Sequence, residues 1–289
     1  MSDYKGTLQN PDLSMYGPWA VIAGGSEGVG AEFARQLAAT NINLVLAARK
    51  PEPLAETGEA CRELGVDVRT LAVDLVDGGV DEIIRATADI EVGLLICNAG
   101  ANTHSMEFLD GDADEFQRVI DLNITATLAL VRHFGRAMRD RRRGGILLVG
   151  SLAEFAGSVR HTTYGGSKAF LRIFAEGLWL ELRDHGVHVL ELILGVTRTP
   201  AMARVGLNFD APGLTVSEPA DVAREGLAHL ADGPVRIVSG NMESVARRLD
   251  PDRAKVVLEG HRAVARLMGL EPSTDVENSA PTGQEAVRG

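Results

Sequence analysis

Short apolar runs alternate along the chain with longer segments in which apolar and polar residues mix. Each run has the length of a buried strand, and several end directly before Gly, Asn or Asp, where strands commonly stop. The predicted strands cover residues 19–23, 43–48, 68–73, 93–97, 146–149, 187–193 and 235–238. Between them apolar residues recur at helical spacing, and the predicted helices cover residues 31–39, 51–64, 112–139, 168–184 and 219–231. One or two further helices are predicted within residues 241–269.

The segment at residues 168–184 is apolar on nearly every side, with Phe170, Leu178 and Trp179 among its side chains. A helix of this kind must bury more than one face. We expect one face to cover the sheet and the other to form a subunit interface with the helix at 112–139. The protein is therefore predicted to be a homodimer or a homotetramer.

Residues 151–168 carry the strongest candidate chemistry. Ser151 follows the strand at 146–149, and Tyr164 and Lys168 stand four residues apart, which places both on one face of a helix. A phenol is a poor proton donor at neutral pH, and a neighbouring ammonium improves it because the ammonium stabilises the phenolate. The alternative is an exposed Tyr and Lys on a helix, and this spacing taken alone favours that alternative.

A glycine-rich turn follows the first predicted strand and leads into the first helix. Its glycines permit a tight turn and a close approach of the backbone to a pyrophosphate, and the free N–H groups of the helix would face the anion. The candidate cofactor residues in this turn are Gly24, Ser26, Glu27, Gly28, Val29 and Gly30. An ordinary strand-to-helix turn is the alternative for this motif alone.

Three more motifs follow the glycine-rich turn along the chain. Asn98-Ala99-Gly100 comes after a strand, Asn123 lies within a helix, and Ser151 precedes the Tyr164 and Lys168 pair. With this ordered set the chain resembles the classical short-chain dehydrogenase/reductase family over roughly residues 18–245.

The resemblance implies an α/β protein with one Rossmann-like domain, a doubly wound parallel sheet with helices on both faces. Residues 1–17 would form an N-terminal arm and residues 18–245 the catalytic domain. Residues 246–269 would form a C-terminal helical extension. The last residues, 270–289, are rich in Pro, Ser, Thr and Glu and are expected to be disordered.

The resemblance also implies an activity, the NAD(P)-dependent interconversion of a carbonyl and a secondary alcohol by hydride transfer. Tyr164 would donate the proton, Lys168 would stabilise the phenolate and hold the nicotinamide ribose, and Ser151 would bind the carbonyl oxygen. Asn123 would support the proton relay. The alternative is a catalytically idle nucleotide-binding scaffold, or a redox-responsive regulator, on the same fold.

Further residues would line the cofactor and the substrate in a protein of this family. The implied cofactor residues beyond the glycine-rich turn are Arg49, Asp74, Leu75, Asn98, Ala99, Gly100, Tyr164, Lys168, Thr197 and Thr199. The implied substrate residues are Ser151, Phe155, Tyr164, Met202 and Phe209, the last two on a lid at about residues 200–219. An apolar ketone or hydroxy compound (steroid, fatty acyl or polyketide-like) would fit them. A helix N-cap is the alternative role for Asp74.

The sequence departs from the family pattern at three positions. Ala23 and Leu194 stand where Thr and Pro are usual, and Thr197 replaces an apolar residue. These changes concern the turn after the first strand and the path of the loop that carries Thr199.

The residues at the end of the second predicted strand indicate whether the cofactor is NAD or NADP. An acidic residue there would bind the ribose 2′-hydroxyl of NAD, whereas here Ala48 leaves room and Arg49 can pair with a 2′-phosphate. Glu27 opposes this preference, because relatives that select NADP often carry a basic residue in that turn. We therefore favour NADP(H), with NAD(H) still possible; two solvated surface cations at 49 and 50 are the alternative.

The composition of the chain limits the partners, metal sites and cellular location that we expect. The 289 residues carry a net charge of −11, so a nucleic acid or an anionic membrane surface is not expected as the main partner. No apolar run approaches the ~18 residues of a membrane helix, and the first residues lack a secretory signal. Two cysteines and scattered histidines suggest no disulfide framework and no metal site. We expect a cytoplasmic location.

Overall fold

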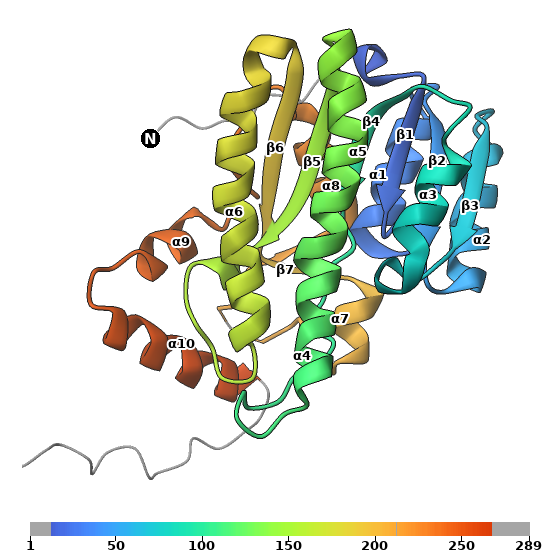
Figure 1. The fold of residues 1–289 in the computed structure, drawn as a ribbon. Coiled ribbons are helices and arrows are strands. Elements are labelled where there is room, and N and C mark those ends of the chain that lie inside the picture. Colours follow the sequence, from blue (N-terminus) through green and yellow to red (C-terminus); the bar gives the residue numbers. More distant parts are fainter. Residues whose placement is uncertain (1–12, 212, 268–289) are drawn as a thin grey trace, which may run out of the picture.

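A seven-stranded parallel sheet forms the centre of the protein (Figure 1). The computed structural model describes residues 13–211 and 213–267. The strand order is β3-β2-β1-β4-β5-β6-β9, and every neighbouring pair is parallel. The strands are β1 (Trp19–Ala23), β2 (Asn43–Ala48), β3 (Val68–Ala72), β4 (Val92–Cys97), β5 (Gly144–Ser151), β6 (Val187–Leu194) and β9 (Val235–Ile237). All seven predicted strands form, and the predicted Rossmann-like α/β fold is confirmed.

Helices cover both faces of the sheet (Figure 1). One face carries α1 (Gly28–Ala38), α2 (Pro51–Arg62) and α8 (Pro219–Ala228). The other carries α3 (Val80–Ala86), α4 (Ala113–Ile120), α5 (Ala126–Arg141) and α6 (Thr162–Leu182). Further elements follow β6, namely β7 (Val196–Thr197), α7 (Pro200–Arg204), β8 (Val216–Ser217), α9 (Met242–Arg248) and α10 (Arg253–Leu267). None of the described helices is long and apolar enough to cross a bilayer.

Strands β1, β2, β4, β5 and β6 contribute side chains to two separate cores. In β1, Ala20 and Ile22 pack on the α1 side, whereas Val21 and Ala23 pack on the α5 and α6 side. A parallel sheet covered by helices on both faces has no solvated side, so its central strands are apolar at nearly every position rather than at alternate ones. This explains why continuous apolar runs located the strands.

Two helices differ from the sequence prediction. The helix predicted at 112–139 is divided, because a π-helical turn at Asp121–Thr125 separates α4 from α5. The helix predicted to begin near residue 168 begins at Thr162, so Tyr164 lies in its first turn. Of the predicted N-terminal arm, only residues 13–17 lie in the described range, and there Leu13 and Tyr16 are buried. The predicted tail at 270–289 lies outside that range.

The chain reverses direction across the sheet between β1 and β4. From β1 it proceeds outward through β2 to β3, and from β4 it proceeds the other way through β5 to β6. The connections that leave β1 and β4 therefore diverge at the carboxyl edge of the sheet, and such a divergence opens a crevice for a ligand. The glycine-rich turn and Asn98 stand at this edge.

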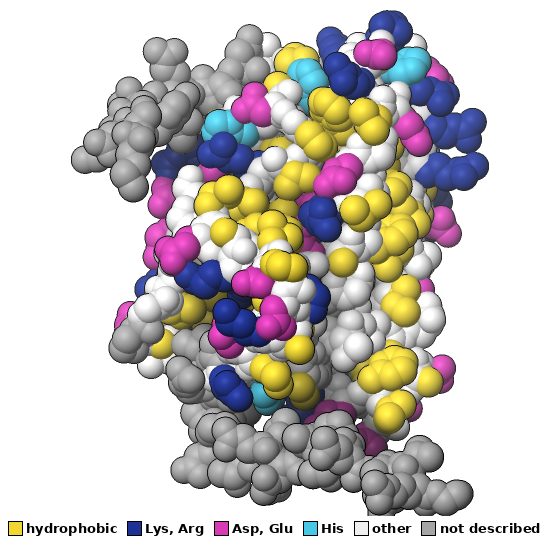
Figure 2. Space-filling model, turned by 90° about the vertical axis from the view of Figure 1, so that its left-hand side faces the viewer, with side chains coloured by type: hydrophobic (Ala, Val, Ile, Leu, Met, Phe, Trp, Pro, Cys, Tyr) yellow, Lys and Arg dark blue, Asp and Glu magenta, His cyan; other side chains and the backbone are white. Residues whose placement is uncertain are grey.

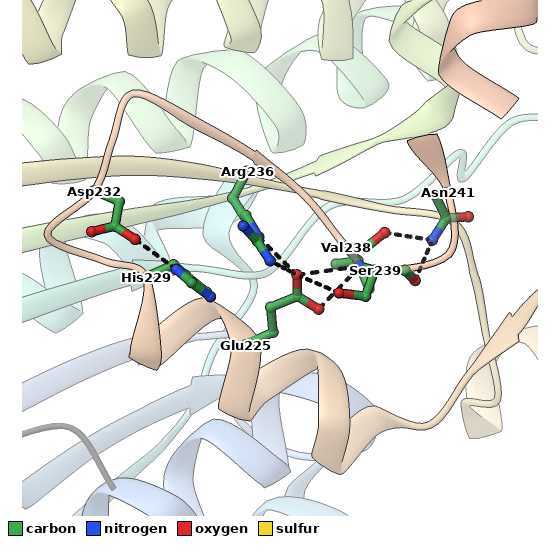
Figure 3. A network of polar contacts seen from close by, with 7 residues as sticks. All are labelled: Glu225, His229, Asp232, Arg236, Val238, Ser239 and Asn241. Carbon is green, nitrogen blue, oxygen red and sulfur yellow. Dashed lines mark hydrogen bonds and ion pairs between the residues drawn. The ribbon is translucent and has the colours of Figure 1, made fainter. Parts of the chain in front are cut away.

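The far end of the sheet is held by a polar network (Figure 3). Glu225 on α8 accepts hydrogen bonds from Arg236 Nε at 2.7 Å and from the Ser239 backbone N–H at 3.0 Å. The turn fixed in this way carries Asn241, whose Nδ2 donates to the Val238 carbonyl at 3.0 Å. A β-carbon on Gly195 would lie 2.1 Å from Asn241 Oδ1, so the loop after β6 can approach this turn only with glycine there.

Candidate active site

The predicted catalytic Lys168 is anchored to the sheet. Its Nζ donates to the carbonyl oxygen of Val149 on β5 at 2.9 Å, and the residue is only 4% exposed. Tyr164 lies one turn earlier on α6, and its ring centroid is 5.8 Å from Lys168 Nζ. A buried ammonium is stable only with such partners, so this contact fixes the distance between α6 and the end of β5.

Asn123 reaches the same place from the π-helical turn. Its Nδ2 donates to Ala101 O at 3.0 Å and to Val119 O at 2.8 Å. Its Oδ1 is buried and has no donor among the described residues. A β-carbon on Gly100 would lie 2.7 Å from Asn123 Oδ1 and 2.9 Å from Lys168 Nζ, so the two polar groups converge on the space that glycine leaves open.

Ser151 ends β5 and begins a short turn. Its Oγ accepts a hydrogen bond from the Ala153 N–H at 3.2 Å, which leaves the hydroxyl proton available to a ligand. Its backbone N–H points to Glu154 Oε2 at 3.4 Å, and together the two contacts form a capping box. Ser151 is therefore held two residues beyond the carbonyl that anchors Lys168.

The glycine-rich turn is packed from two sides. Gly24 and Gly28 have positive φ angles of 90° and 58°. Asn98 Nδ2 donates to the Gly24 carbonyl at 2.8 Å, and a β-carbon on Gly30 would lie 1.9 Å from that carbonyl oxygen. Helix α1 starts at Gly28, so its free N–H groups face the carboxyl edge of the sheet, as binding of a pyrophosphate requires. These residues fit a dinucleotide cofactor.

Glu27 in this turn is already paired. Arg204 on α7 donates to its Oε2 at 3.0 Å, and Lys50 Nζ lies 3.4 Å from its Oε1. The hydrogen bonds from Arg204 lower the pKa of Glu27 below its ordinary value. The predicted lid segment is thus tied to the glycine-rich turn, a contact that the sequence did not reveal.

Asp74 has the N-cap role that was the alternative for it, and it also lies near two arginines. It caps the turn after β3 by accepting from the Val76 N–H at 3.0 Å, which is the predicted N-cap alternative. Its Oδ2 also lies 3.9 Å from Arg49 Nη1 and 3.7 Å from Arg118 Nη2. Leu75 packs against the α3 side of the core. Arg118 was not predicted at this site. The only available signal in the sequence was its position near the start of the helix predicted at 112–139.

The loop after β6 covers the glycine-rich turn. Thr199 Oγ1 accepts from the Met202 N–H at 3.2 Å and so caps α7. A β-carbon on Gly28 would lie 3.0 Å from the Thr199 methyl carbon, so this loop touches the turn directly. Thr197 is 4% exposed, and its hydroxyl donates to Gly195 O at 3.3 Å.

The predicted substrate residues are only partly brought together. Phe155 lies 5.5 Å from the Arg172 guanidinium and borders a cavity of about 330 Å³ that also involves Arg253 of α10. Neither Ser151 nor Tyr164 lines this cavity. Phe209 lies under the Arg198 guanidinium at 4.8 Å. Met202 is half-buried on α7, beside Thr199.

Sequence reasoning missed two buried carboxylates near Lys168. Glu154 and Glu191 are 7% and 0% exposed. Glu191 is the one charged residue of β6, and a lone charge inside an otherwise apolar strand was the available signal.

Burial also raises the pKa of the nearby Cys97 thiol to about 12, so that group is neutral. No group of three potential metal ligands occurs in the described part of the chain.

The comparison with known families agrees with this geometry. The sequence profile of the short chain dehydrogenase family matches residues 18–208. The chain belongs to the short-chain dehydrogenase family. The resemblance drawn from the ordered motifs is confirmed.

The chain is also similar to individual proteins and to solved structures. The chain is 35% identical over 208 residues to a very-long-chain 3-oxoacyl-CoA reductase of Podospora anserina and 36% identical over 211 residues to that of Neurospora crassa. Each match covers 68% of this chain but only 61% and 62% of the relative. A short-chain dehydrogenase from Sphingobium yanoikuyae in complex with NADPH is 30% identical, with a TM-score of 0.70, and the match covers 93% of this chain and 98% of the other. A 7beta-hydroxysteroid dehydrogenase structure has a TM-score of 0.78 at 25% identity over 86% and 98% of the two chains.

The packing of the glycine-rich turn leads to a first prediction. Gly30→Ala places a methyl group against the Gly24 carbonyl, which is backbone and cannot move aside. We expect a loss of about 1–3 kcal/mol in the free energy of unfolding and at least a tenfold rise in the Kd for NADPH. Urea unfolding and fluorescence titration measure the two effects.

Gly260→Ala is the matched control. Gly260 lies on α10 with no atom within 4 Å of the added carbon, so alanine should stabilise the helix by about 0.5–1 kcal/mol. If Gly30→Ala binds NADPH as tightly as wild type does, the turn does not carry the cofactor.

Proposed function

We propose that this chain is an NADP(H)-linked reductase of a long-chain 3-oxoacyl thioester or a similarly apolar ketone. The observation that carries the proposal is the buried ammonium of Lys168, held 2.9 Å from Val149 O with Tyr164 one turn away. A bound nicotinamide cofactor would supply the hydride in the reduction. The reaction also needs a proton donor and a hydrogen-bond donor that orients the carbonyl group. Residues of the chain would supply both.

Tyr164 would donate its phenolic proton to the carbonyl oxygen as the carbon–oxygen double bond is reduced. Lys168 would stabilise the resulting phenolate, because it stands beside the ring in a site of low dielectric. Ser151 would donate its free hydroxyl proton to the same oxygen and orient the carbonyl. Asn123 Oδ1, which is buried and has no donor among the described residues, would accept a hydrogen bond from the group that returns a proton to Lys168.

The substrate class rests on the named relatives and on the lid. The relatives from Podospora anserina and Neurospora crassa are very-long-chain 3-oxoacyl-CoA reductases. The proposed lid carries Met202, Leu207 and Phe209, which are half-buried and would offer apolar surface to an acyl chain. An acyl chain is therefore a better candidate than a polar sugar ketone.

The charges at the adenosine end favour NADP(H). Four cations gather there, Arg49, Lys50, Arg118 and Arg204, against three carboxylates, Glu27, Asp74 and Asp77. The balance of 4 − 3 leaves one positive charge. Because Arg204 and Lys50 already neutralise Glu27, this carboxylate opposes a 2′-phosphate less than the sequence alone suggested.

Tyr164→Phe tests the catalytic assignment. Removing the phenolic proton should lower kcat by about a hundredfold to ten-thousandfold, while the Kd for NADPH stays within threefold of wild type. NADPH oxidation with a long-chain 3-oxoacyl-CoA, a steroid ketone and an aliphatic ketone measures turnover, with NADH as a second cofactor.

Tyr16→Phe is the control for this substitution. Its hydroxyl contacts His188 at 2.6 Å, far from Lys168 in the fold, so turnover per folded molecule should not change. Turnover of Tyr164→Phe within tenfold of wild type would remove Tyr164 from its role as the acid. Wild-type binding of NADPH without turnover on any ketone would favour a nucleotide-binding scaffold.

The double variant Ala48→Asp with Arg49→Leu tests the cofactor preference. The Arg49 side chain is 57% exposed, so solvent weakens its interaction with a 2′-phosphate. We expect this interaction to lower the Kd for NADPH by about tenfold, the lower end of the range for a charge-assisted hydrogen bond. The double variant should bind NADH more tightly than NADPH. Arg224→Leu, an exposed cation on α8, should leave both dissociation constants unchanged. Equal affinity of the wild type for NADH and NADPH contradicts the preference.

We also propose that two copies associate through α6. Phe170, Ile173 and Leu180 on this helix are 41%, 58% and 62% exposed. Figure 2, which views the molecule from the side that carries α6, shows hydrophobic side chains spread over that face. The outward positions of α5 carry Arg132, Arg136 and Arg139 instead, so the helix at 112–139 contributes less apolar surface than its sequence suggested.

Ile173→Glu should shift the protein toward monomer in sedimentation equilibrium at micromolar concentration, because a buried carboxylate at the interface has no partner. Leu64→Glu, at an exposed position after α2, should leave the mass unchanged. A wild-type protein that sediments as a monomer overturns the interface. The cytoplasmic location expected from the sequence stays a prediction.

A further inference from the structure

Two carboxylates that the proposed reaction does not use lie directly behind its catalytic residues. Glu191 points from β6 toward the α6 side of the sheet, and Glu154 folds back over the end of β5. A β-carbon on Gly150 would lie 2.7 Å from Glu191 Oε1 and 3.1 Å from Glu154 Oε2. Both carboxylates therefore converge on the space above Gly150, the residue between Val149 and Ser151.

The two carboxylates differ in their partners. Glu154 Oε1 forms an ion pair with Arg172 Nε at 3.3 Å, although neither of these two atoms has a hydrogen-bond partner among the described residues, and Glu154 Oε2 accepts from the Ser151 N–H at 3.4 Å. Glu191 is fully buried, and neither of its oxygens has a hydrogen-bond partner among the described residues. An ionised carboxylate in that position would be a buried charge without a donor, which is costly, whereas a protonated carboxyl group is neutral.

We propose that Glu191 carries a proton while Glu154 carries the negative charge, and that this pair positions Ser151 and Lys168 for the proposed reaction. The inference thus rests on the proposed function for its catalytic part. Glu154 holds the Ser151 N–H. The neutral Glu191 leaves Lys168 bound to Val149 O, whereas an ionised Glu191 would attract the ammonium toward β6.

The surroundings of the pair support this distribution of charge. On α6, the charged groups that face it are Lys168, Arg172 and Glu176, where Arg172 also pairs with Glu176 at 3.3 Å. Strand β5 contributes no titratable group, and on β9 the Arg236 side chain pairs with Glu225 of α8 on the opposite face of the sheet. The Cys97 thiol on β4 is neutral.

The directions of the pKa shifts agree with the geometry. Burial, followed by the charge of Glu154, raises the pKa of Glu191 above its ordinary value. Burial also raises the pKa of Glu154, but the Ser151 N–H and Arg172 oppose the shift. Glu154 is therefore the more acidic member. Because the folded protein holds a proton that the unfolded chain releases above about pH 4.5, stability should fall as the pH rises from that value toward the folded pKa.

The first test does not depend on enzyme activity. Glu191→Gln mimics the protonated residue, and Glu176→Gln removes an exposed carboxylate that pairs with the same Arg172. Burial raises the pKa of Glu154 to about 7 and that of Glu191 to about 9, so infrared spectra at pH 8 should show a protonated carboxyl band in wild type and in Glu176→Gln, and this band should be largely lost in Glu191→Gln. Between about pH 5 and pH 8, the folding constant of wild type should fall by up to tenfold more per pH unit than that of Glu191→Gln.

The second test concerns positioning. Glu154→Ala removes the acceptor of the Ser151 N–H, so kcat should fall at least tenfold while the Kd for NADPH stays within threefold. Glu154→Gln retains an acceptor oxygen and should recover kcat to within threefold of wild type. At neutral pH the kcat of Glu191→Gln should be close to that of wild type. As the pH rises, the kcat of Glu191→Gln should fall less than the kcat of wild type.

Several results would overturn the proposal. Absence of the carboxyl band, or parallel unfolding curves for wild type and Glu191→Gln, would mean that Glu191 is ionised. Equal kcat for Glu154→Ala, Glu154→Gln and wild type would remove the positioning role. If wild type reduces no carbonyl compound, the proposed function fails, and the infrared and unfolding measurements still decide the protonation of the pair.

Discussion

The hydrogen bond from Lys168 Nζ to Val149 O is the contact on which the site depends. A buried ammonium loses its hydration, and only donors and acceptors in fixed positions compensate for that loss. The site also depends on three further conditions, namely that α6 begins before Tyr164, that Gly100 leaves room for Lys168 Nζ and that β5 ends at Ser151. Each of these conditions is met by a different segment, so the site forms only when the sheet and α6 are packed together.

The same edge of the sheet holds both halves of the site because the chain reverses there. Asn98 after β4 binds the Gly24 carbonyl after β1, which joins the two connections that diverge at the switch point. The lid meets this junction through Arg204 and Glu27. This ionic contact neutralises a carboxylate that would repel a phosphate, so under the proposed function the cofactor preference would depend on the position of the lid.

The sequence predicted the strands well because buried parallel strands are continuous apolar runs bounded by turn residues. It predicted the catalytic and glycine-rich motifs through their order along the chain. It placed the start of α6 too late, because Thr162, Thr163, Gly165 and Gly166 are weak helix formers and their helical state depends on tertiary packing. The π-helical turn at Asn123 was not predicted, since no local periodicity marks it.

Glu154 and Glu191 show why such pairs escape a sequence reading. Their 37-residue separation (191 − 154) gives no motif, and each looks like an isolated acid until the fold places both above Gly150. Two ionised carboxylates and the cations Lys168 and Arg172 would also balance, so charge counting alone does not decide their state. The partners decide it: Arg172 forms an ion pair with Glu154, the Ser151 N–H donates to Glu154, and Val149 O holds Lys168, whereas Glu191 has neither an ion pair nor a hydrogen-bond donor among the described residues. A neutral Glu191 is therefore the state in which every other contact of the site can persist.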